Sequence, residues 1–183
     1  MAVLEVVVWP AKVLETRASE VSKFDDHLRS FVKDMHDTMK AANGIGLAAN
    51  QVGDLRRVIT IEIPWVPNDD ADDSDDHCEP KEWWHDKKFT FVNPKITKKS
   101  GKFRYQEGCL SFPEVYEFID RAADIWVTAQ DENGKSFEVH ATGLLSVCLQ
   151  HEIDHIDGIV FIDRMSRLKA GLAKKKLKRP VTP

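Results

Sequence analysis

Near its C-terminal end the chain reads Gln150-His151-Glu152-Ile153-Asp154-His155, an H-E-x-x-H motif inside an apolar run. If this run is helical, His151 and His155 lie one turn apart on the same face, and both imidazoles can meet one metal ion. Glu152 can then reach a water molecule beside that ion, which is the layout of a metallohydrolase. The alternative is a helix that carries two surface histidines beside a glutamate.

A metal site of this kind needs a third protein ligand, because catalytic zinc-type centres typically use three and leave one position open. After His155 the chain has no further His, Glu or Cys, and no motif supports Asp157 or Asp163. The third ligand is therefore expected upstream, where two thiols compete. Cys148 is separated from His155 by about 10 Å of helix rise, so we expect it to form an apolar wall of the pocket. Cys109, in a glycine-containing turn, is the predicted ligand.

The composition is that of an ordinary globular protein. The chain has 183 residues, a formal net charge of -4 and 42% hydrophobic residues, which favours one domain over residues 1–183. Three cysteines without a framework spacing argue against a secreted disulfide scaffold and favour a reducing compartment. The apolar N-terminal run is too short to span a membrane and has no basic flank, so we expect neither a signal nor a transit peptide. These features together predict a cytoplasmic protein.

Hydrophobic periodicity predicts an α+β fold. A helix is expected to begin at Asp25 or Asp26 and to end at Asn43-Gly44, and a second one, with Thr142 as its N-cap and Gly158 at its end, carries the H-E-x-x-H motif. A last helix is expected over residues 164–178. Strands are expected at residues 3–9, 57–63, 89–98, 102–105, 115–120, 125–130 and 136–141, the last two joined by a hairpin at Asn133-Gly134. Grouped strands with helices at the ends predict antiparallel or mixed sheets packed around a central H-E-x-x-H helix, with an N-terminal and a C-terminal helix.

Two further stretches carry residues suited to catalysis. The first reads Gly44-Ile45-Gly46-Leu47-Ala48-Ala49-Asn50-Gln51. Its glycines let the backbone approach a ligand closely, and Gln51 has amide donors that can stabilise an oxyanion; a tight turn packed on small residues is the alternative. The second, Glu107-Gly108-Cys109-Leu110-Ser111, belongs to a turn expected over residues 107–113, in which the N–H of Leu110 would point into the site.

Two charged segments have less specific interpretations. An acidic insert at about residues 64–88 is expected to be a solvated loop rather than a lid, and His77, Cys78 and His85 within it have no spacing that supports a second metal site. Residues 164–179 contain eight Lys or Arg and no acid. This basic C-terminal helix is either a solvated helix or a surface that docks on ribosomal RNA.

The three motifs, in this order and spacing, resemble the three signature motifs of the peptide deformylases, and the resemblance covers nearly the whole chain except the acidic insert. The resemblance implies a metallohydrolase that removes the N-formyl group from the formyl-methionine of new polypeptides and releases formate. It implies one divalent ion, ferrous iron in the cell, which zinc, nickel or cobalt can replace. The implied partners are N-formyl-methionyl nascent chains, with no membrane and no DNA.

The resemblance also assigns roles to residues. Cys109, His151 and His155 would hold the ion, and a water activated by it would attack the formyl carbon with Glu152 as general acid and base. Gln51 and the backbone N–H of Leu110 would polarise the formyl oxygen. Substrate-binding residues would be Ile45, Gly46, Glu107, Gly108, Leu144, Val147 and Cys148. Family precedent pairs Glu107 with Arg121, although a surface salt bridge is the alternative.

Two rival functions remain at this stage. A zincin-type metallopeptidase would cut internal peptide bonds and survive replacement of Cys109. A non-catalytic metal-binding module would lose nothing on replacement of Glu152. One departure from the family pattern concerns the substrate rim, because Tyr116 stands where many bacterial members carry a basic residue.

Overall fold

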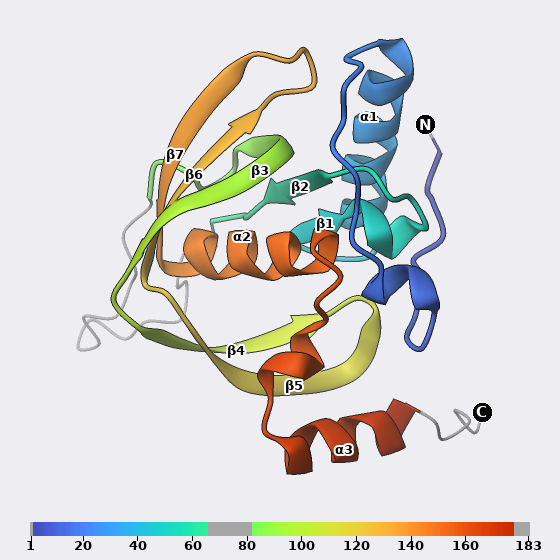
Figure 1. Ribbon diagram of the computed structural model, residues 1–183, viewed down its shortest axis with the longest axis vertical. Coiled ribbons are helices and arrows are strands. Elements are labelled where there is room, and N and C mark those ends of the chain that lie inside the picture. The colour runs from blue at the N-terminus through green and yellow to red at the C-terminus, as the bar shows by residue number, and fades with distance from the viewer. Residues whose placement is uncertain (1, 66–81, 178–183) are drawn as a thin grey trace.

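The computed structural model describes residues 2–65 and 82–177, which form two antiparallel sheets with one helix between them (Figure 1). The predicted α+β class, with a central H-E-x-x-H helix, is confirmed. Among the described residues the strands are β1 (Gly46–Ala48), β2 (Val58–Glu62), β3 (Lys88–Ser100), β4 (Phe103–Cys109), β5 (Phe112–Arg121), β6 (Asp124–Gln130) and β7 (Ser136–Thr142). The α-helices are α1 (Asp26–Ala41), α2 (Gly143–Ile156) and α3 (Arg167–Leu177), and the 3-10 turns are η1 (Lys12–Glu15), η2 (Ala49–Val52) and η3 (Phe161–Arg164).

The larger sheet has the order β1-β2-β3-β6-β7, and the smaller one pairs β4 with β5. Strand β6 shows the alternation of a half-buried strand, with Ile125, Val127 and Ala129 turned to the core and the residues between them only partly buried. The β6–β7 hairpin turns at the predicted Asn133-Gly134, where Gly134 has a positive φ of 84°. The structure therefore confirms this hairpin.

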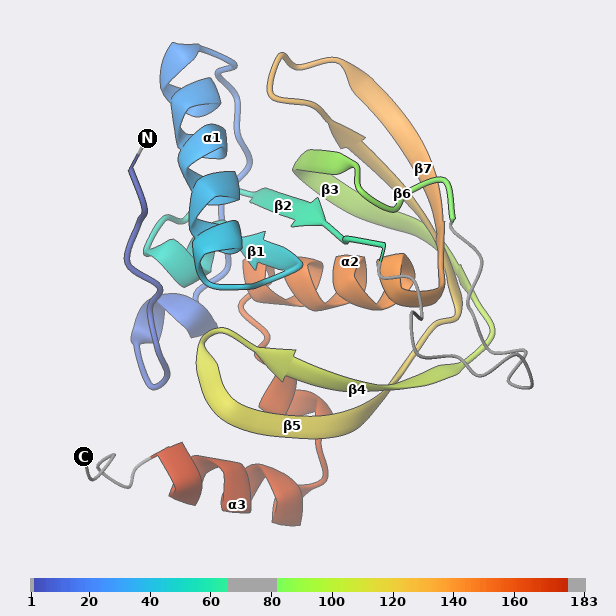
Figure 2. The same cartoon turned by 180° about the vertical axis from the view of Figure 1, so that it is seen from behind.

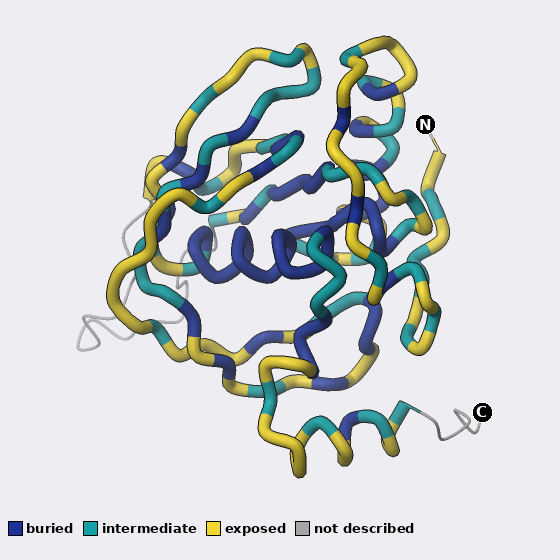
Figure 3. Tube along the Cα trace, in the orientation of Figure 1, coloured by how far each residue is buried: buried dark blue, intermediate teal, exposed yellow. Residues whose placement is uncertain are grey.

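Helix α2 is the centre of the molecule, since every residue from Leu145 to Ile156 is buried (Figure 3). It follows β7 directly, and Thr142 is its N-cap residue, although the threonine side chain makes no capping hydrogen bond. Gly158 ends the helix with a φ of 76°, and a Cβ there would lie 2.9 Å from the carbonyl oxygen of Glu15. Both predicted boundary residues are confirmed.

Helix α1 covers one end of the larger sheet, as the two opposite views show (Figures 1 and 2). Its predicted N-cap is Asp25, whose Oδ1 accepts a hydrogen bond from the N–H of Leu28 at 3.0 Å. Its apolar stripe packs in a cluster with β1 and β2. The chain leaves α1 at Asn43-Gly44, as predicted, and enters β1, so the helix positions the first glycine motif.

The expected strand at residues 3–9 is wrong. This segment is extended, but it pairs with none of the described strands, and single hydrogen bonds anchor it: Val7 N–H to Gln51 O at 2.7 Å and Trp9 N–H to Ser111 O at 3.0 Å. Both acceptors belong to the catalytic-motif segments rather than to a strand edge, so the apolar run at residues 3–9 packs as irregular backbone.

The last helix begins later than predicted, at Arg167 rather than at residue 164. Arg164 ends the short turn η3, and Met165 after it is extended (ψ 162°), which interrupts the helix. Most of the predicted acidic insert (residues 66–81, including His77 and Cys78) and residues 178–179 of the predicted basic helix lie outside the described residues. None of the described helices is long and apolar enough to cross a membrane.

Candidate functional site

Three side chains from two elements form a cluster suited to a metal ion. Cys109 lies at the end of β4, and His151 and His155 lie on α2; their ligand atoms are all within 4.8 Å of one another. The Sγ of Cys109 is 3.2 Å from Nε2 of His155. One thiolate and two imidazoles match the donor set of a four-coordinate ion with one open position. No other group of this kind occurs in the described parts of the chain.

Cys109 reaches the helix by a different route from the one expected. The turn predicted over residues 107–113 is present but shorter, because β4 continues to Cys109 and β5 resumes at Phe112, with Cys109 and Phe112 paired across a tight connection. Only Leu110 and Ser111 lie between the strands. A strand hydrogen-bonded to its neighbour holds the thiol more firmly than a flexible turn would.

A buried carboxylate orients His151. Nδ1 of His151 lies 2.7 Å from Oε2 of Glu107, so the proton sits on Nδ1 and Nε2 is free to face the other ligands. Arg121 donates to both oxygens of Glu107, at 2.7 and 3.0 Å. Burial alone would raise the pKa of Glu107, but the hydrogen bonds from Arg121 and His151 lower it to about 2. The pairing with Arg121 implied by the resemblance is therefore present, and it is buried rather than on the surface.

The Glu152 carboxylate is placed differently. It is buried, its Oε2 has no hydrogen-bond partner among the described residues, and a Cβ on Gly46 would lie only 2.5 Å from its Oε1. Burial raises its pKa to about 7, although the nearby His151 acts in the opposite direction. A carboxyl group with this pKa can both accept and donate a proton near neutral pH.

The other titratable groups of the site also have shifted pKa values. Burial lowers the pKa of His155 well below its ordinary value, which keeps the ring neutral, the form that binds a metal. Burial raises the pKa of the Cys148 thiol. Cys148 lies outside the ligand cluster and its Sγ is 3.8 Å from the Ile45 carbonyl oxygen. Cys148 thus lines the wall of the cavity, whereas Cys109 belongs to the cluster that fits a single metal ion.

Gln51 is held with its amide nitrogen toward the cluster. Its Oε1 accepts from the N–H of Ala48 at 2.9 Å, while Nε2 donates to Ser111 Oγ at 3.3 Å and lies 3.6 Å from Cys109 Sγ. Leu110 follows Cys109 directly, and its side chain lies close enough to Gly44 that a Cβ there would meet it at 2.9 Å. The first and second motifs are therefore packed against each other.

A cavity of about 530 Å³ opens beside the cluster. Its lining includes all seven predicted substrate-binding residues: Ile45, Gly46, Glu107, Gly108, Leu144, Val147 and Cys148. It also includes residues that the sequence analysis did not assign to the pocket: Tyr105, Gln106, Phe112, Pro113, Glu114 and Val115. These lie on β4 and β5 around Cys109. Recognising the tight β4–β5 connection would have placed them there, because strand pairing brings them beside the thiol.

Comparison with known proteins agrees with this geometry. A family model described as polypeptide deformylase matches residues 3–171. The peptide deformylase of Novosphingobium aromaticivorans is 43% identical over 185 residues, covering 98% of this chain and 97% of the relative. That of Neisseria gonorrhoeae is 40% identical over 179 residues, covering 98% and 96%. The chain belongs to the peptide deformylase family.

Solved structures of this family have the same fold. The crystal structure of peptide deformylase from Ehrlichia chaffeensis superposes with a TM-score of 0.84 at 39% identity, covering 97% of this chain and 96% of the other. A structure of the Ehrlichia chaffeensis enzyme in complex with actinonin superposes with a TM-score of 0.85 at 38% identity, covering 97% of each chain. The family consists of metal-dependent hydrolases that act on formyl-methionyl peptides, so this deformylase is an enzyme of that class.

Proposed function

We propose that Cys109, His151 and His155 hold one divalent ion, ferrous iron in the cell, and that Glu152, Gln51 and Leu110 complete the catalytic centre for deformylation. The observation that carries this proposal is the buried, unpartnered Oε2 of Glu152 beside a cluster of three ligands. A thiolate with two imidazoles suits iron, zinc or cobalt better than magnesium or calcium, and the preference for iron rests on the family resemblance. When bound, the ion supplies Lewis acidity, lowering the pKa of a water and polarising the formyl oxygen.

Glu152 moves the protons of the reaction. With a pKa of about 7, its carboxylate takes a proton from the attacking water and then delivers it to the methionine nitrogen as formate leaves. Gly46 leaves no room for a side chain beside Oε1, so the backbone of β1 limits the positions that the carboxylate can take in the cavity. Confinement of this kind raises the fraction of encounters with correct geometry.

Gln51 and Leu110 receive the negative charge that develops on the formyl oxygen. The Gln51 amide is fixed in advance by its bonds to Ala48 and Ser111, so Nε2 needs no reorganisation during the reaction. The N–H of Leu110 is the second donor. Removal of one such donor typically costs about 10²–10³ in rate.

The substrate enters between two strand edges. Among the described residues, β1 is the terminal strand of the larger sheet and β4 pairs only with β5, and residues of both line the cavity. An extended peptide can add to such edges through its backbone. Leu144, Val147 and Cys148 on α2 and Ile45 opposite them provide the apolar slot for the methionine side chain. A narrow space at the formyl hydrogen would exclude an acetyl group.

The test is formate release from a formyl-Met tripeptide by protein purified without oxygen and loaded with ferrous iron or nickel. Glu152→Gln should keep its metal and lose turnover, and an acetyl-Met peptide should react far more slowly than the formyl one. Actinonin should compete with the peptide, because it is bound in the Ehrlichia chaffeensis structure. Cleavage of internal peptide bonds, with activity surviving in Cys109→Ser, would favour a zincin-type peptidase.

We further propose that the enzyme works in the cytoplasm on nascent chains and docks on ribosomal RNA through α3. Lys169 of α3 is paired with Glu117, and Lys176 contacts Glu114. Arg167 and Lys175 are exposed and form no ion pair within the described residues, so they remain for phosphates. Replacing Arg167 and Lys175 by Ala should lower the affinity for the ribosome and make that affinity less sensitive to salt. Turnover of a free peptide should not change. Unchanged ribosome binding would refute the docking surface.

A further inference from the structure

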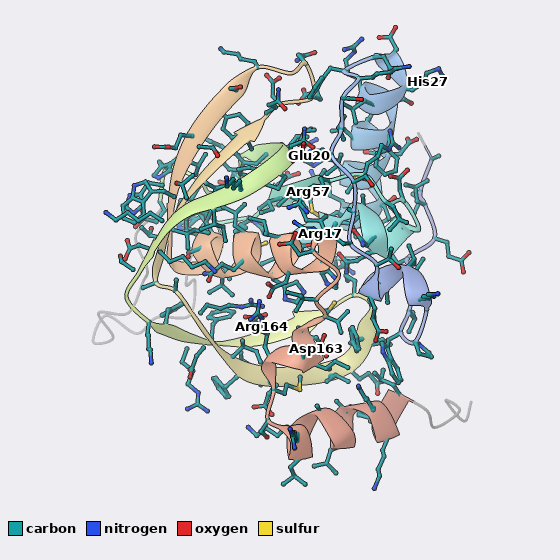
Figure 4. The ribbon with its side chains drawn as sticks, viewed as in Figure 1. Arg17, Glu20, His27, Arg57, Asp163 and Arg164 are labelled. Atoms are coloured by element: carbon teal, nitrogen blue, oxygen red, sulfur yellow. The ribbon has the colours of Figure 1, made fainter. Side chains whose placement is uncertain are left out.

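A second cavity, of about 950 Å³, lies along α2 and is lined by charged residues that include Arg57, Asp154, Asp157 and Arg164. Figure 4 shows Arg57 and Arg164 beside this helix. Their charges are neutralised in place: Arg57 pairs with Asp157 at 2.7 Å, and Arg164 pairs with Asp154 at 2.6 Å. This second cavity is therefore lined mainly by two partly solvent-exposed ion pairs at the C-terminal end of α2, whose charges are already neutralised.

The Arg164 pair is connected to the metal centre. Arg164 binds Asp154 with two donors, Nη2 to Oδ1 at 2.6 Å and Nε to Oδ2 at 3.0 Å. The same carboxylate accepts from Nη1 of Arg121 at 2.5 Å. Arg121 uses its other two donors on Glu107, which in turn holds Nδ1 of the metal ligand His151. Within the described residues, the Arg57–Asp157 pair has no hydrogen-bonded connection to the cluster.

We propose that Arg164 is a positioning residue for the metal centre, acting through Asp154, Arg121 and Glu107. Asp154 and Arg121 are buried, with side chains 12% and 4% exposed, whereas Arg164 is 42% exposed at the open end of the chain of contacts. Two carboxylates and two guanidinium groups alternate, and the set is neutral. A buried carboxylate needs a paired cation.

Removal of Arg164 leaves Asp154 with Arg121 alone. Arg121 is then drawn toward Asp154, and its two-pronged contact with Glu107 loosens. Glu107 is the group that fixes the orientation and tautomer of His151, so the imidazole Nε2 loses its fixed direction toward the ion. Groups that orient a metal ligand from outside typically change metal affinity by about 10–100-fold, and the more remote Arg164 belongs at the lower end of that range.

The experiment compares Arg164→Gln with Arg57→Gln in the cobalt- and zinc-loaded protein. Both changes remove one positive charge that pairs with an aspartate near the C-terminal end of α2, so the general effect of charge is matched. Zn²⁺ affinity is measured by competition with a chromophoric chelator, and the Co²⁺ absorption spectrum reports ligand geometry. Arg164→Gln should bind Zn²⁺ about tenfold more weakly and alter the Co²⁺ bands, whereas Arg57→Gln should lower the melting temperature and leave both metal readouts unchanged.

A third variant covers the case in which Arg164→Gln does not fold. Arg164→Lys keeps the charge but cannot reproduce the two-pronged contact, so it should give an intermediate affinity. Equal metal affinity in parent, Arg164→Lys and Arg164→Gln, or equal losses in Arg164→Gln and Arg57→Gln, would overturn the inference. Absence of a thiolate–cobalt band in the parent would instead refute the metal assignment itself, a failure distinct from that of Arg164.

Discussion

Gly46 is the position where a single methyl group should disable catalysis without removing the metal. It lies in β1, buried against α2, and a Cβ would meet Glu152 Oε1 at 2.5 Å, Cys148 Sγ at 2.7 Å and Glu152 Cδ at 3.0 Å. Ordinary contact begins at 3.4 Å. In Gly46→Ala the Glu152 carboxylate must therefore retreat by about 0.9 Å, because β1 is fixed by its pairing with β2.

The expected loss follows from that displacement. A misplacement of about 1 Å in a reacting group can cost about 10²-fold in rate, and the extra volume in a packed interior costs about 1–3 kcal/mol of stability. Because Glu152 is not among the three ligands, the variant should keep its metal. We expect kcat to fall about 100-fold, with metal content and KM close to those of the parent.

The assay is formate release at saturating peptide, alongside metal analysis and thermal unfolding. Gly171→Ala is the matched control, because a Cβ at Gly171 on α3 meets nothing within 4 Å; it should be fully active and gain up to about 1 kcal/mol of helix stability. Full activity of Gly46→Ala with metal retained would show that the position of Glu152 is not restricted by β1. Loss of metal would show that the methyl group acts on the ligands instead.

Three further outcomes follow from contacts described above. Glu107 has a folded pKa of about 2 against an ordinary value of 4.5, so it contributes about 3 kcal/mol of stability above pH 4.5 that disappears as the pH falls toward 2. In acid unfolding, the stability of Glu107→Gln should therefore depend much less on pH over this interval. Parallel curves of stability against pH for parent and variant would refute the shift. Gly158→Ala, with its positive φ and its contact with Glu15, should lose at least about 1–2 kcal/mol in urea unfolding, and an unchanged midpoint would contradict the strain. Tyr116→Arg adds a cation at a rim position that is 67% exposed. It should raise the ratio of kcat/KM for a formyl-Met tripeptide with glutamate at the third position to kcat/KM for the same peptide with lysine there about two- to fivefold. An unchanged ratio would place the third residue of the peptide elsewhere.

The central helix was readable from the sequence because several local signals agree there. The apolar run, the N-cap at Thr142 and the glycine at Gly158 all mark one helix, and the His151–His155 spacing works only on a helix. Cys109 was predicted as the third ligand because Cys148 is too far from His155 along the helix, and the cluster that fits a single ion contains Cys109. Local chemistry is sufficient where the functional groups lie on one regular element.

What the sequence did not disclose depends on contacts between distant segments. Gly108, beside Cys109, suggested a turn that begins at Glu107, yet tertiary pairing continues β4 through Glu107 and Gly108. Residues 3–9 are rich in valine, as a strand would be, but pair with no strand among the described residues. Arg164 belongs to a basic run by composition, whereas its partner is Asp154, ten residues earlier on α2. Patterns within a short window carry no information about these partners.

The two sheets share no strand pairing in the part of the chain that the structure describes, and the ligand cluster takes one member from the small sheet and two from the helix between them. A bound ion would therefore fasten the β4–β5 hairpin to the rest of the molecule, and its binding energy would become folding energy. In a newly made chain that has not captured an ion, or whose Cys109 has been oxidised, the hairpin would be held to α2 only by contacts such as Arg121 with Asp154, and it would open to cellular proteases more often. Metal supply would then affect the lifetime of the protein in the cell as well as its rate of turnover.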